Sequence, residues 1–259
     1  MNLKLPMHLA NNYTSQTQVA RVTTEAWVAE NILCPNCGGS LKKYSSNTKS
    51  KDVFCMFCKE EYQVKSSKTR FSNRIIGAEY NTTLRSVESG QHPSLMLLHY
   101  SQQNMEVVDV QIIHRSCITA SSIIPRQPLG SNARRAGWQG CMIDLNKIPN
   151  TAKLFILENG KEQSAEKVKK LWQTSNAILN VKPESRGWIS DVLAVVEKQS
   201  DHFTLTQVYE YAEAVSELHP NNRHVHAKIR QQLQILRDMG VIAFESRGYY
   251  SKSKALQNG

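Results

Sequence analysis

Two closely spaced pairs of cysteines constrain this chain more than any other feature of its sequence. Cys34 and Cys37 form the first pair, and Cys55 and Cys58 form the second, in the spacing C-x2-C-x17-C-x2-C. Each pair can supply two thiolates to one metal ion, and two pairs complete the tetrahedral ligand set that Zn²⁺ prefers. Because four thiolates leave no position for water, the sequence predicts a structural zinc site. Four buried thiols without a metal, or redox chemistry by one pair, are the alternatives.

The other two cysteines, Cys117 and Cys141, have apolar neighbours and are expected to be buried without a ligand role. The first residues lack the apolar region of a secretory signal, and no run of about 18 apolar residues indicates a membrane span. We therefore expect a cytoplasmic protein without disulfides and without a membrane partner.

The charge of the chain points to a polyanionic partner. The formal net charge is +10 at pH 7. Such an excess favours nucleic acid or an anionic membrane surface, and no strongly basic amphipathic helix supports the second. Nucleic acid is therefore the preferred partner. A basic surface that serves only solubility is the alternative.

The pattern of apolar residues predicts a mixed α/β domain over residues 1–181. Period-two runs predict a central sheet, because successive residues of a strand face opposite sides. The expected strands are two short ones within 52–65, then 94–100, 106–114, 141–145 and 153–157. Helices are expected at 17–33, 75–87 and 165–174, a basic loop at 126–138 and a linker at 175–185.

A different pattern over residues 182–259 predicts a winged-helix domain. Helices are expected at 188–198, 206–217 and 223–239, the last ending before Gly240. The run VIAFESRGYYSKS that follows is typical of a β-hairpin. Three helices and a hairpin are the elements of a winged helix, which binds DNA with its third helix in the major groove.

Three polar residues around the second cysteine pair are spaced as in a metal-dependent nuclease. Asp52, Gln63 and Lys65 follow the pattern D-x10-Q-x-K, and adjacent strands would bring them to one sheet edge. Phosphodiester cleavage needs a hard cation with oxygen ligands, which Asp52 and Gln63 could supply, with Val64 assigned to the same Mg²⁺ site. Lys65 could orient or deprotonate the attacking water. A solvated strand edge is the alternative.

Several longer runs resemble the methyl-directed restriction endonucleases of the DpnI type. The runs are ARRAGWQGCMIDL at 133–145, KIRQQLQILRD at 228–238, SRGW at 185–188, and CPNCG with CMFC. The resemblance covers nearly the whole chain in the same order. It implies an α/β restriction-endonuclease-like, PD-(D/E)xK domain with an embedded four-cysteine zinc site, followed by an α+β winged helix.

The resemblance also implies an activity. It is Mg²⁺-dependent cleavage of double-stranded 5′-GATC-3′ carrying N6-methyladenine, with blunt ends, in which both domains read the methylated site. By position, Asp52, Gln63 and Lys65 match the family's catalytic residues. Trp138 matches an aromatic residue that senses the adenine methyl groups.

One position departs from the family. Gln63 stands where the family has Glu, and its amide oxygen can bind magnesium but brings no charge. A natural active variant, a slow or decayed enzyme and a deliberately weakened chain are three interpretations, and we favour the first. Glu61, on the same face of the expected strand, could act as a replacement ligand.

The residues expected to recognise DNA lie in the basic loop and in the winged helix. In the loop, Trp138 would form an aromatic wall for the methyl group beside Arg134 and Arg135; a role in the core is its alternative. In the second domain we expect base or phosphate contacts from Arg223, His224, Lys228, Gln231, Gln234, Arg247 and Lys252. A solvated surface charge is the alternative for each of them.

Two other functions compete with this interpretation. A non-catalytic reader of methylated DNA would keep the zinc domain as a scaffold, and Gln63 favours it. A repair nuclease acting on mismatched or branched DNA is the other. We expect the chain to act on DNA as a monomer, which would cut the two strands in succession.

Overall fold

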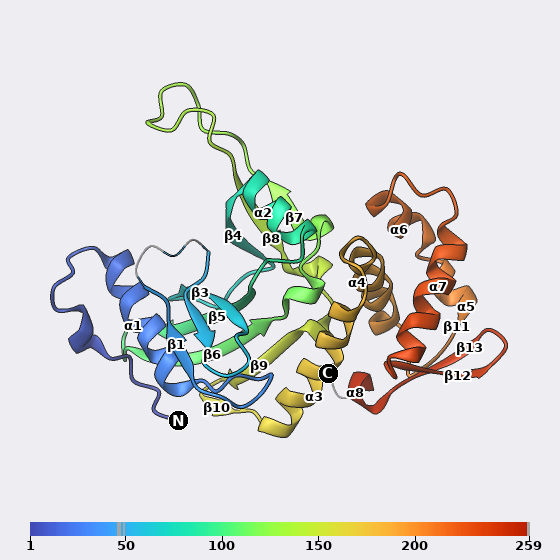
Figure 1. The fold of residues 1–259 in the computed structure, drawn as a ribbon, viewed down its shortest axis with the longest axis horizontal. Coiled ribbons are helices and arrows are strands. Elements are labelled where there is room, and N and C mark those ends of the chain that lie inside the picture. Colours follow the sequence, from blue (N-terminus) through green and yellow to red (C-terminus); the bar gives the residue numbers. More distant parts are fainter. Residues whose placement is uncertain (46–47, 49, 258–259) are drawn as a thin grey trace. The chain divides into compact units, whose positions relative to one another are not determined.

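The computed structural model describes residues 1–45, 48 and 50–257. The chain forms two compact units (Figure 1). The first consists of residues 1–72, 92–115 and 153–172, and the second of residues 73–91, 116–152 and everything from 173 onward. Each unit contains segments that are far apart in the sequence.

The first unit is built on one mixed sheet, whose described strands run in the order β1-β2-β3-β5-β6-β9-β10. Strands β3 and β5 are parallel, and the other neighbouring pairs are antiparallel. The strands are β1 (Leu41–Lys43), β2 (Val53–Cys55), β3 (Glu61–Ser67), β5 (Ser94–Ser101), β6 (Glu106–Ile113), β9 (Lys153–Glu158) and β10 (Lys161–Glu162). The helices are η1 (Met7–Ala10), α1 (Gln16–Asn31) and the first half of α3 (Ala165–Ala177).

Helix α1 covers a core built from the apolar residues of the central strands. Trp27 is fully buried, and its indole N–H donates to the Asn2 carbonyl over 2.8 Å. Alternate residues of β5, Met96 and Leu98, belong to the same apolar cluster as Trp27 and Tyr62 of β3. This alternation places Gln63 and Lys65 on the opposite face of β3 from Tyr62.

The second unit contains a small antiparallel sheet in the order β4-β8-β7. Its strands are β4 (Arg74–Glu79), β7 (Ile123–Pro125) and β8 (Gly140–Asp144). Helix α2 (Tyr80–Glu88) begins at Glu79, whose carboxylate accepts the N–H groups of Asn81 and Thr82. Residues 126–139 connect β7 to β8 as a long loop that runs out from this sheet (Figure 1).

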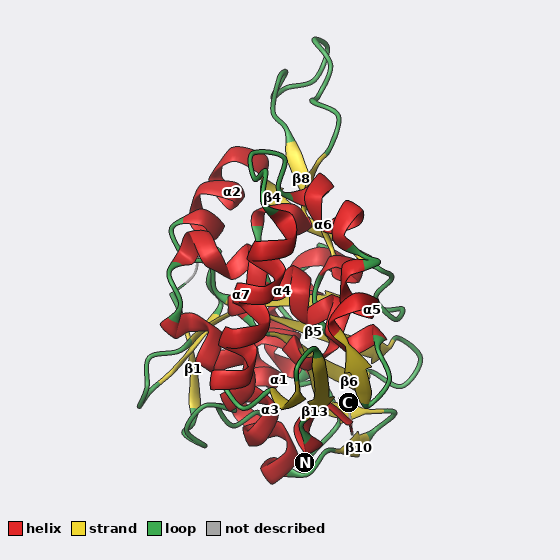
Figure 2. Ribbon diagram, turned by 90° about the vertical axis from the view of Figure 1, so that its right-hand side faces the viewer, coloured by secondary structure: helices red, strands yellow, loops and turns green. Residues whose placement is uncertain are grey.

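The rest of the second unit has the elements of a winged helix. Helix α7 packs against α4 (Figure 2). Ile229, Leu233 and Leu236 of α7 are buried. The wing strands pair in the order β11-β13-β12. The elements are α4 (Pro183–Lys198), β11 (His202–Thr204), α5 (Leu205–Tyr209), α6 (Ala212–Leu218), α7 (Val225–Asp238), β12 (Ile242–Ser246), β13 (Tyr249–Lys252) and α8 (Lys254–Gln257). Short 3-10 turns occur at η2 (Arg115–Cys117), η3 (Ala120–Ser122), η4 (Leu145–Lys147), η5 (Asn150–Ala152) and η6 (Ile178–Asn180).

Four sequence-based boundaries were wrong. Residues 75–87 are not one helix, because strand β4 occupies the first part and α2 the second. Gly77 permits this pairing, since a Cβ there would lie 2.4 Å from the Cys141 sulfur on β8. The expected linker 175–185 is largely helical, and α4 begins at Pro183 because proline suits the first turn of a helix. The helix expected at 206–217 is divided into α5 and α6 around Glu210 and Tyr211.

The fourth boundary bears on recognition. Helix α7 begins at Val225, so Arg223 and His224 lie before it rather than on its outer face. Cys117 and Cys141 are buried, as expected. Among the described residues, no helix is both long and apolar enough to cross a bilayer.

Two glycines of the second unit give opposite stability predictions. Gly240 has φ +70° after α7, so Gly240→Ala should destabilise the protein by about 1 kcal/mol through backbone strain alone. Gly187 lies within α4, and a Cβ there meets only His219 at an ordinary 3.5 Å. Gly187→Ala should therefore stabilise by up to about 1 kcal/mol. Urea unfolding of both variants tests this; effects of the same sign would contradict it.

Candidate metal centres and nucleic-acid interface

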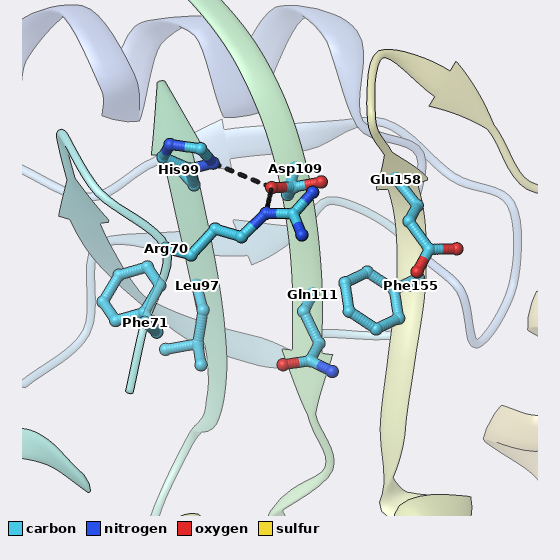
Figure 3. Close-up of a pocket in the computed structure, with 8 residues that line it drawn as sticks. All are labelled: Arg70, Phe71, Leu97, His99, Asp109, Gln111, Phe155 and Glu158. Carbon is cyan, nitrogen blue, oxygen red and sulfur yellow. Dashed lines mark hydrogen bonds and ion pairs between the residues drawn. The ribbon is translucent and has the colours of Figure 1, made fainter. Parts of the chain in front are cut away.

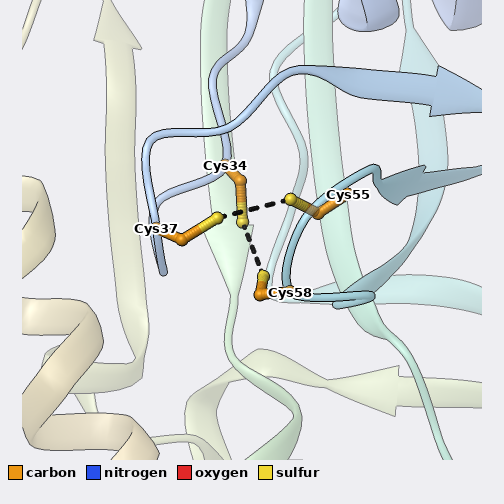
Figure 4. Close-up of side chains that lie close together, drawn as sticks. All are labelled: Cys34, Cys37, Cys55 and Cys58. Atoms are coloured by element: carbon orange, nitrogen blue, oxygen red, sulfur yellow. Dashed lines mark hydrogen bonds between the residues drawn. The ribbon is translucent and has the colours of Figure 1, made fainter.

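The four cysteines of the two pairs converge on one point (Figure 4). Their sulfur atoms all lie within 4.8 Å of one another. The Cys34 and Cys58 sulfurs are 3.6 Å apart, and those of Cys37 and Cys55 are 3.4 Å apart. Tetrahedral zinc with Zn–S bonds of about 2.3 Å requires sulfurs about 3.8 Å apart. The cluster therefore fits a zinc ion and can hold one.

Local backbone geometry brings the sulfurs together. In the first pair the Cys34 N–H bonds the Gly39 carbonyl, and the Cys34 carbonyl accepts the Gly38 N–H, over 2.8 and 2.7 Å. Gly38 has φ +74°, and a Cβ on Gly39 would lie 2.4 Å from the Phe57 ring. In the second pair, burial raises the pKa of Cys55, but N–H groups of Cys58 and Phe57 bring it down to about 7. A lowered thiol pKa favours the thiolate that binds metal.

Asp52 lies beside strand β3 at the point where β2 begins. The Asp52 N–H donates to the Tyr62 carbonyl over 2.9 Å, and its Oδ2 accepts the Val64 N–H over 2.8 Å. The carboxylate thus takes the place of the next ladder bond between β2 and β3. Since a strand residue points its N–H and C=O toward the same neighbour, the Val64 carbonyl also faces the Asp52 side.

Gln63 and Lys65 lie on one face of β3, and Tyr62 lies on the opposite face. The parallel pairing aligns Gln63 with Leu95 and Lys65 with Leu97. Burial raises the pKa of Asp52, whereas the Val64 N–H and the positive charge of Lys65 act in the opposite direction. The Val64 N–H and the Lys65 ammonium group therefore both act on the Asp52 carboxylate.

Glu61 is engaged elsewhere. Its carboxylate accepts bonds from Tyr44 Oη and Lys51 Nζ, each over 2.6 Å. Burial would raise its pKa, but these two partners outweigh burial and lower it. The structure thus offers the replacement-ligand hypothesis for Glu61 no support.

Glu25 of α1 is an acidic neighbour of Asp52 that sequence reasoning missed. Its side chain is 18% exposed and pairs with Arg21 at 4.0 Å. Burial, and then the negative charge of Asp52, raise the pKa of Glu25 to about 7. A helix 27 residues earlier in the chain brings this second carboxylate to the site, and no local spacing indicates it.

A further cluster of polar side chains, the Asp109 group, consists of Arg70, His99 and Asp109 and lines the same pocket as Leu97 (Figure 3). His99 Nδ1 and Asp109 Oδ2 are 2.7 Å apart across β5 and β6, and Arg70 Nε lies 3.3 Å from the same oxygen. Phe71 and Phe155 line the pocket beside them. Burial raises the pKa of Asp109, but the Asn159 N–H, His99 and Arg70 together lower it.

The basic loop between β7 and β8 carries Arg134, Arg135 and Trp138, and residues 126–140 contain three arginines and no acid. The Arg135 guanidinium lies 5.0 Å from the Trp138 ring centroid. A Cβ on Gly140 would lie 2.9 Å from this ring, so Trp138 packs on the backbone there. Trp138 is half-buried and does not belong to the core.

In the winged helix, Gln231 and Gln234 are exposed on α7, as expected for residues that contact bases. Lys228 is half-buried, and its Nζ donates to Gln231 Oε1 over 2.8 Å. Arg223 and His224 are exposed ahead of the helix, and Arg247 is exposed in the turn of the wing. Lys252, also expected to contact phosphates, donates from its ammonium group to the Glu197 carbonyl of α4 over 3.0 Å.

Comparison with known proteins matches both parts of this architecture. The family model DpnI, described as the Dam-replacing family, covers residues 1–181. A second model, the Dam-replacing HTH domain, covers residues 184–252. The chain belongs to the Dam-replacing family.

Membership of the Dam-replacing family confirms the predicted fold class, a mixed α/β domain with a four-cysteine cluster followed by a helix-turn-helix domain. The family is one of methyl-directed restriction endonucleases, so this member is a nuclease that acts on DNA. The cysteine cluster is compatible with zinc.

Because the pKa of Glu25 is raised, we expect Glu25→Gln to increase the stability of the protein in a pH-dependent way. The pKa is 4.5 for an ordinary Glu and about 7 for Glu25 in the folded protein. Between pH 4.5 and about 7, the folded protein therefore holds a proton on Glu25 that the unfolded chain has released. Stability therefore falls as pH rises through this window. Removing the charge should stabilise the protein by roughly 1–3 kcal/mol at pH 8 and have no effect below about pH 4.5.

Denaturant unfolding in magnesium-free buffer measures this difference. Glu30→Gln, on an exposed position of the same helix, is the control and should change little at either pH. An equal effect of Glu25→Gln at both pH values would contradict the assignment.

Proposed function

We propose that this chain is a type II methyl-directed restriction endonuclease. Its substrate would be double-stranded 5′-GATC-3′ carrying N6-methyladenine, cut by Mg²⁺-dependent hydrolysis to blunt ends. The family supports the reaction class. The observation that carries the proposal is the bond from the Val64 N–H to Asp52 Oδ2, over 2.8 Å, which joins Asp52 to the strand of Gln63 and Lys65.

The donor set fits a hard cation. Asp52, the Gln63 side-chain oxygen and the Val64 carbonyl would hold Mg²⁺, which prefers oxygen ligands. When bound, the ion would stabilise negative charge that develops on the phosphate oxygens. Lys65, on the same strand face as Gln63, would orient the attacking water and assist in removing its proton. Asp52 would hold the site in register through Val64.

Gln63 supplies an oxygen but no charge, so Asp52 has to provide the negative charge among these three ligands. The neighbouring Glu25 adds a second carboxylate to the surroundings of Asp52. This arrangement supports an active natural variant over a decayed enzyme. The four cysteines would hold a structural Zn²⁺ beside the same strands.

Recognition would involve two surfaces. In the loop, Trp138 would contact the methyl groups, while Arg134 and Arg135 would bind phosphates. In the winged helix, Gln231, Gln234 and Lys228 of α7 would read bases, and Arg223, His224 and Arg247 would contact the backbone. Each buried methyl contributes on the order of 1 kcal/mol, so the two of a palindrome would give roughly 30-fold preference for each surface that reads both.

We assign catalysis to residues 1–181 and the winged helix to residues 182–259, and propose that a monomer cuts the strands one after the other. A non-catalytic reader of methylated DNA is the competing function, and Gln63 is the observation that favours it.

Digestion of one plasmid, prepared with and without adenine methylation at GATC, tests the proposal. With Mg²⁺ the methylated plasmid should give discrete fragments, and the unmethylated plasmid should stay intact. Lys65→Ala should slow cleavage by about 100-fold or more while leaving the gel shift unchanged, because the loss is in proton transfer.

The outcomes separate the competing functions. If the wild type binds methylated DNA without cutting it, and Gln63→Glu does not cut it either, the protein is a reader. Cleavage that does not depend on methylation would indicate a repair nuclease. Replacing Mg²⁺ by Ca²⁺ is a suitable control, because a strong chelator would also remove zinc.

A further inference from the structure

Tyr62 contacts the cysteine cluster with its side chain. Its hydroxyl oxygen lies 3.2 Å from the Cys34 sulfur. Both residues are buried, with 0% of Tyr62 and 2% of Cys34 exposed. Once Cys34 is a metal-bound thiolate it has no proton, so the Tyr62 hydroxyl is the donor of this bond.

The backbone of Tyr62 contacts the proposed nuclease site. Its carbonyl accepts the Asp52 N–H over 2.9 Å, and its Cα pairs with that of Val53 across β2 and β3. The next residue along the strand is Gln63. A single residue therefore bonds both a cysteine of the cluster and the aspartate proposed to bind Mg²⁺.

The tyrosine ring is held in place by the core. Its centroid lies 6.0 Å from the ring of Trp172 of α3, and it shares the apolar cluster with Trp27 and Cys55. Closely packed side chains do not move independently of their backbone. A shift of the Cys34 thiolate would therefore be transmitted through Tyr62 to β3.

We propose that Tyr62 is a positioning residue that couples the zinc site to the nuclease site. Its hydroxyl stabilises the Cys34 thiolate, and its carbonyl fixes Asp52 beside Val64. Zinc binding thereby sets the register in which Asp52 meets Gln63 and Lys65. This inference rests on the proposed function for its catalytic consequence but not for its effect on zinc.

Tyr62→Phe tests the coupling, because it removes the hydroxyl and keeps the ring. Tyr44→Phe is the matched control, since the Tyr44 hydroxyl bonds Glu61 rather than a cysteine. Three quantities are measured in the full-length zinc-loaded protein across a zinc-buffered series. They are bound zinc, amide hydrogen exchange of residues 61–65, and cleavage of methylated plasmid with Mg²⁺.

Zinc binding by Tyr62→Phe should weaken by roughly 10- to 100-fold, as for loss of other hydrogen bonds to metal ligands. Within each protein, loss of bound zinc, faster exchange of the Val64 amide and loss of cleavage should all occur at the same free zinc concentration. Tyr44→Phe should match the wild type in zinc binding. At saturating zinc, Tyr62→Phe should recover cleavage.

Unchanged zinc affinity in Tyr62→Phe would overturn the proposal. Protection of the Val64 amide that persists after zinc has gone would overturn it as well, even with altered affinity. If the wild type cuts no DNA, the proposed function fails, but zinc binding and amide exchange still decide whether Tyr62 couples the two sites.

Discussion

The convergence of four cysteine sulfurs is the constraint on which the proposed site depends. Cys34 follows helix α1, Cys55 ends strand β2, and Cys58 precedes strand β3, so one metal ion would tie these three elements together. Beta strands this short have little stability without such a tie. The same hairpin carries Asp52 at one end and Gln63 and Lys65 on the other strand. In this fold a structural metal site and a catalytic one would share a backbone, with Tyr62 between them.

Electrostatics divides the chain into a site that gathers acid and surfaces that gather base. Burial, and then the negative charge of Asp52, disfavour ionisation of Glu25, and burial also raises the pKa of Asp52. A divalent cation at Asp52 would favour the charged form of both carboxylates, which would offset part of the charge that Gln63 does not supply. The loop of residues 126–140 carries arginines and no acid, and the exposed residues of α7 include Arg230, Gln231 and Gln234. Such surfaces suit a polyanion whose phosphates are positioned by arginine and whose bases are read by glutamine.

Local spacing was sufficient for the cysteine cluster, because each pair lies in its own short turn, one after α1 and the other between β2 and β3. The D-x10-Q-x-K pattern covers the start of β2 and the neighbouring strand β3, so counting along the chain could propose that these residues lie together. Glu25 could not be found this way, because its approach to Asp52 depends on how α1 packs. The His99–Asp109 pair was missed for a similar reason, since it depends on the register between β5 and β6. The boundary at 75–87 failed because Gly77 and Cys141, 64 positions apart, fit together only in the folded sheet.

The most direct measurement is the anomalous scattering of Mn²⁺ in crystals of the protein with an adenine-methylated GATC duplex. Mn²⁺ takes the same oxygen ligands as Mg²⁺ and can be located without ambiguity. We expect a peak bound by the Asp52 carboxylate, the Val64 carbonyl and the Gln63 side chain, with Lys65 beside the scissile phosphate. A peak held by other residues, such as the Asp109 group, or no peak near Asp52 with DNA bound, would contradict it.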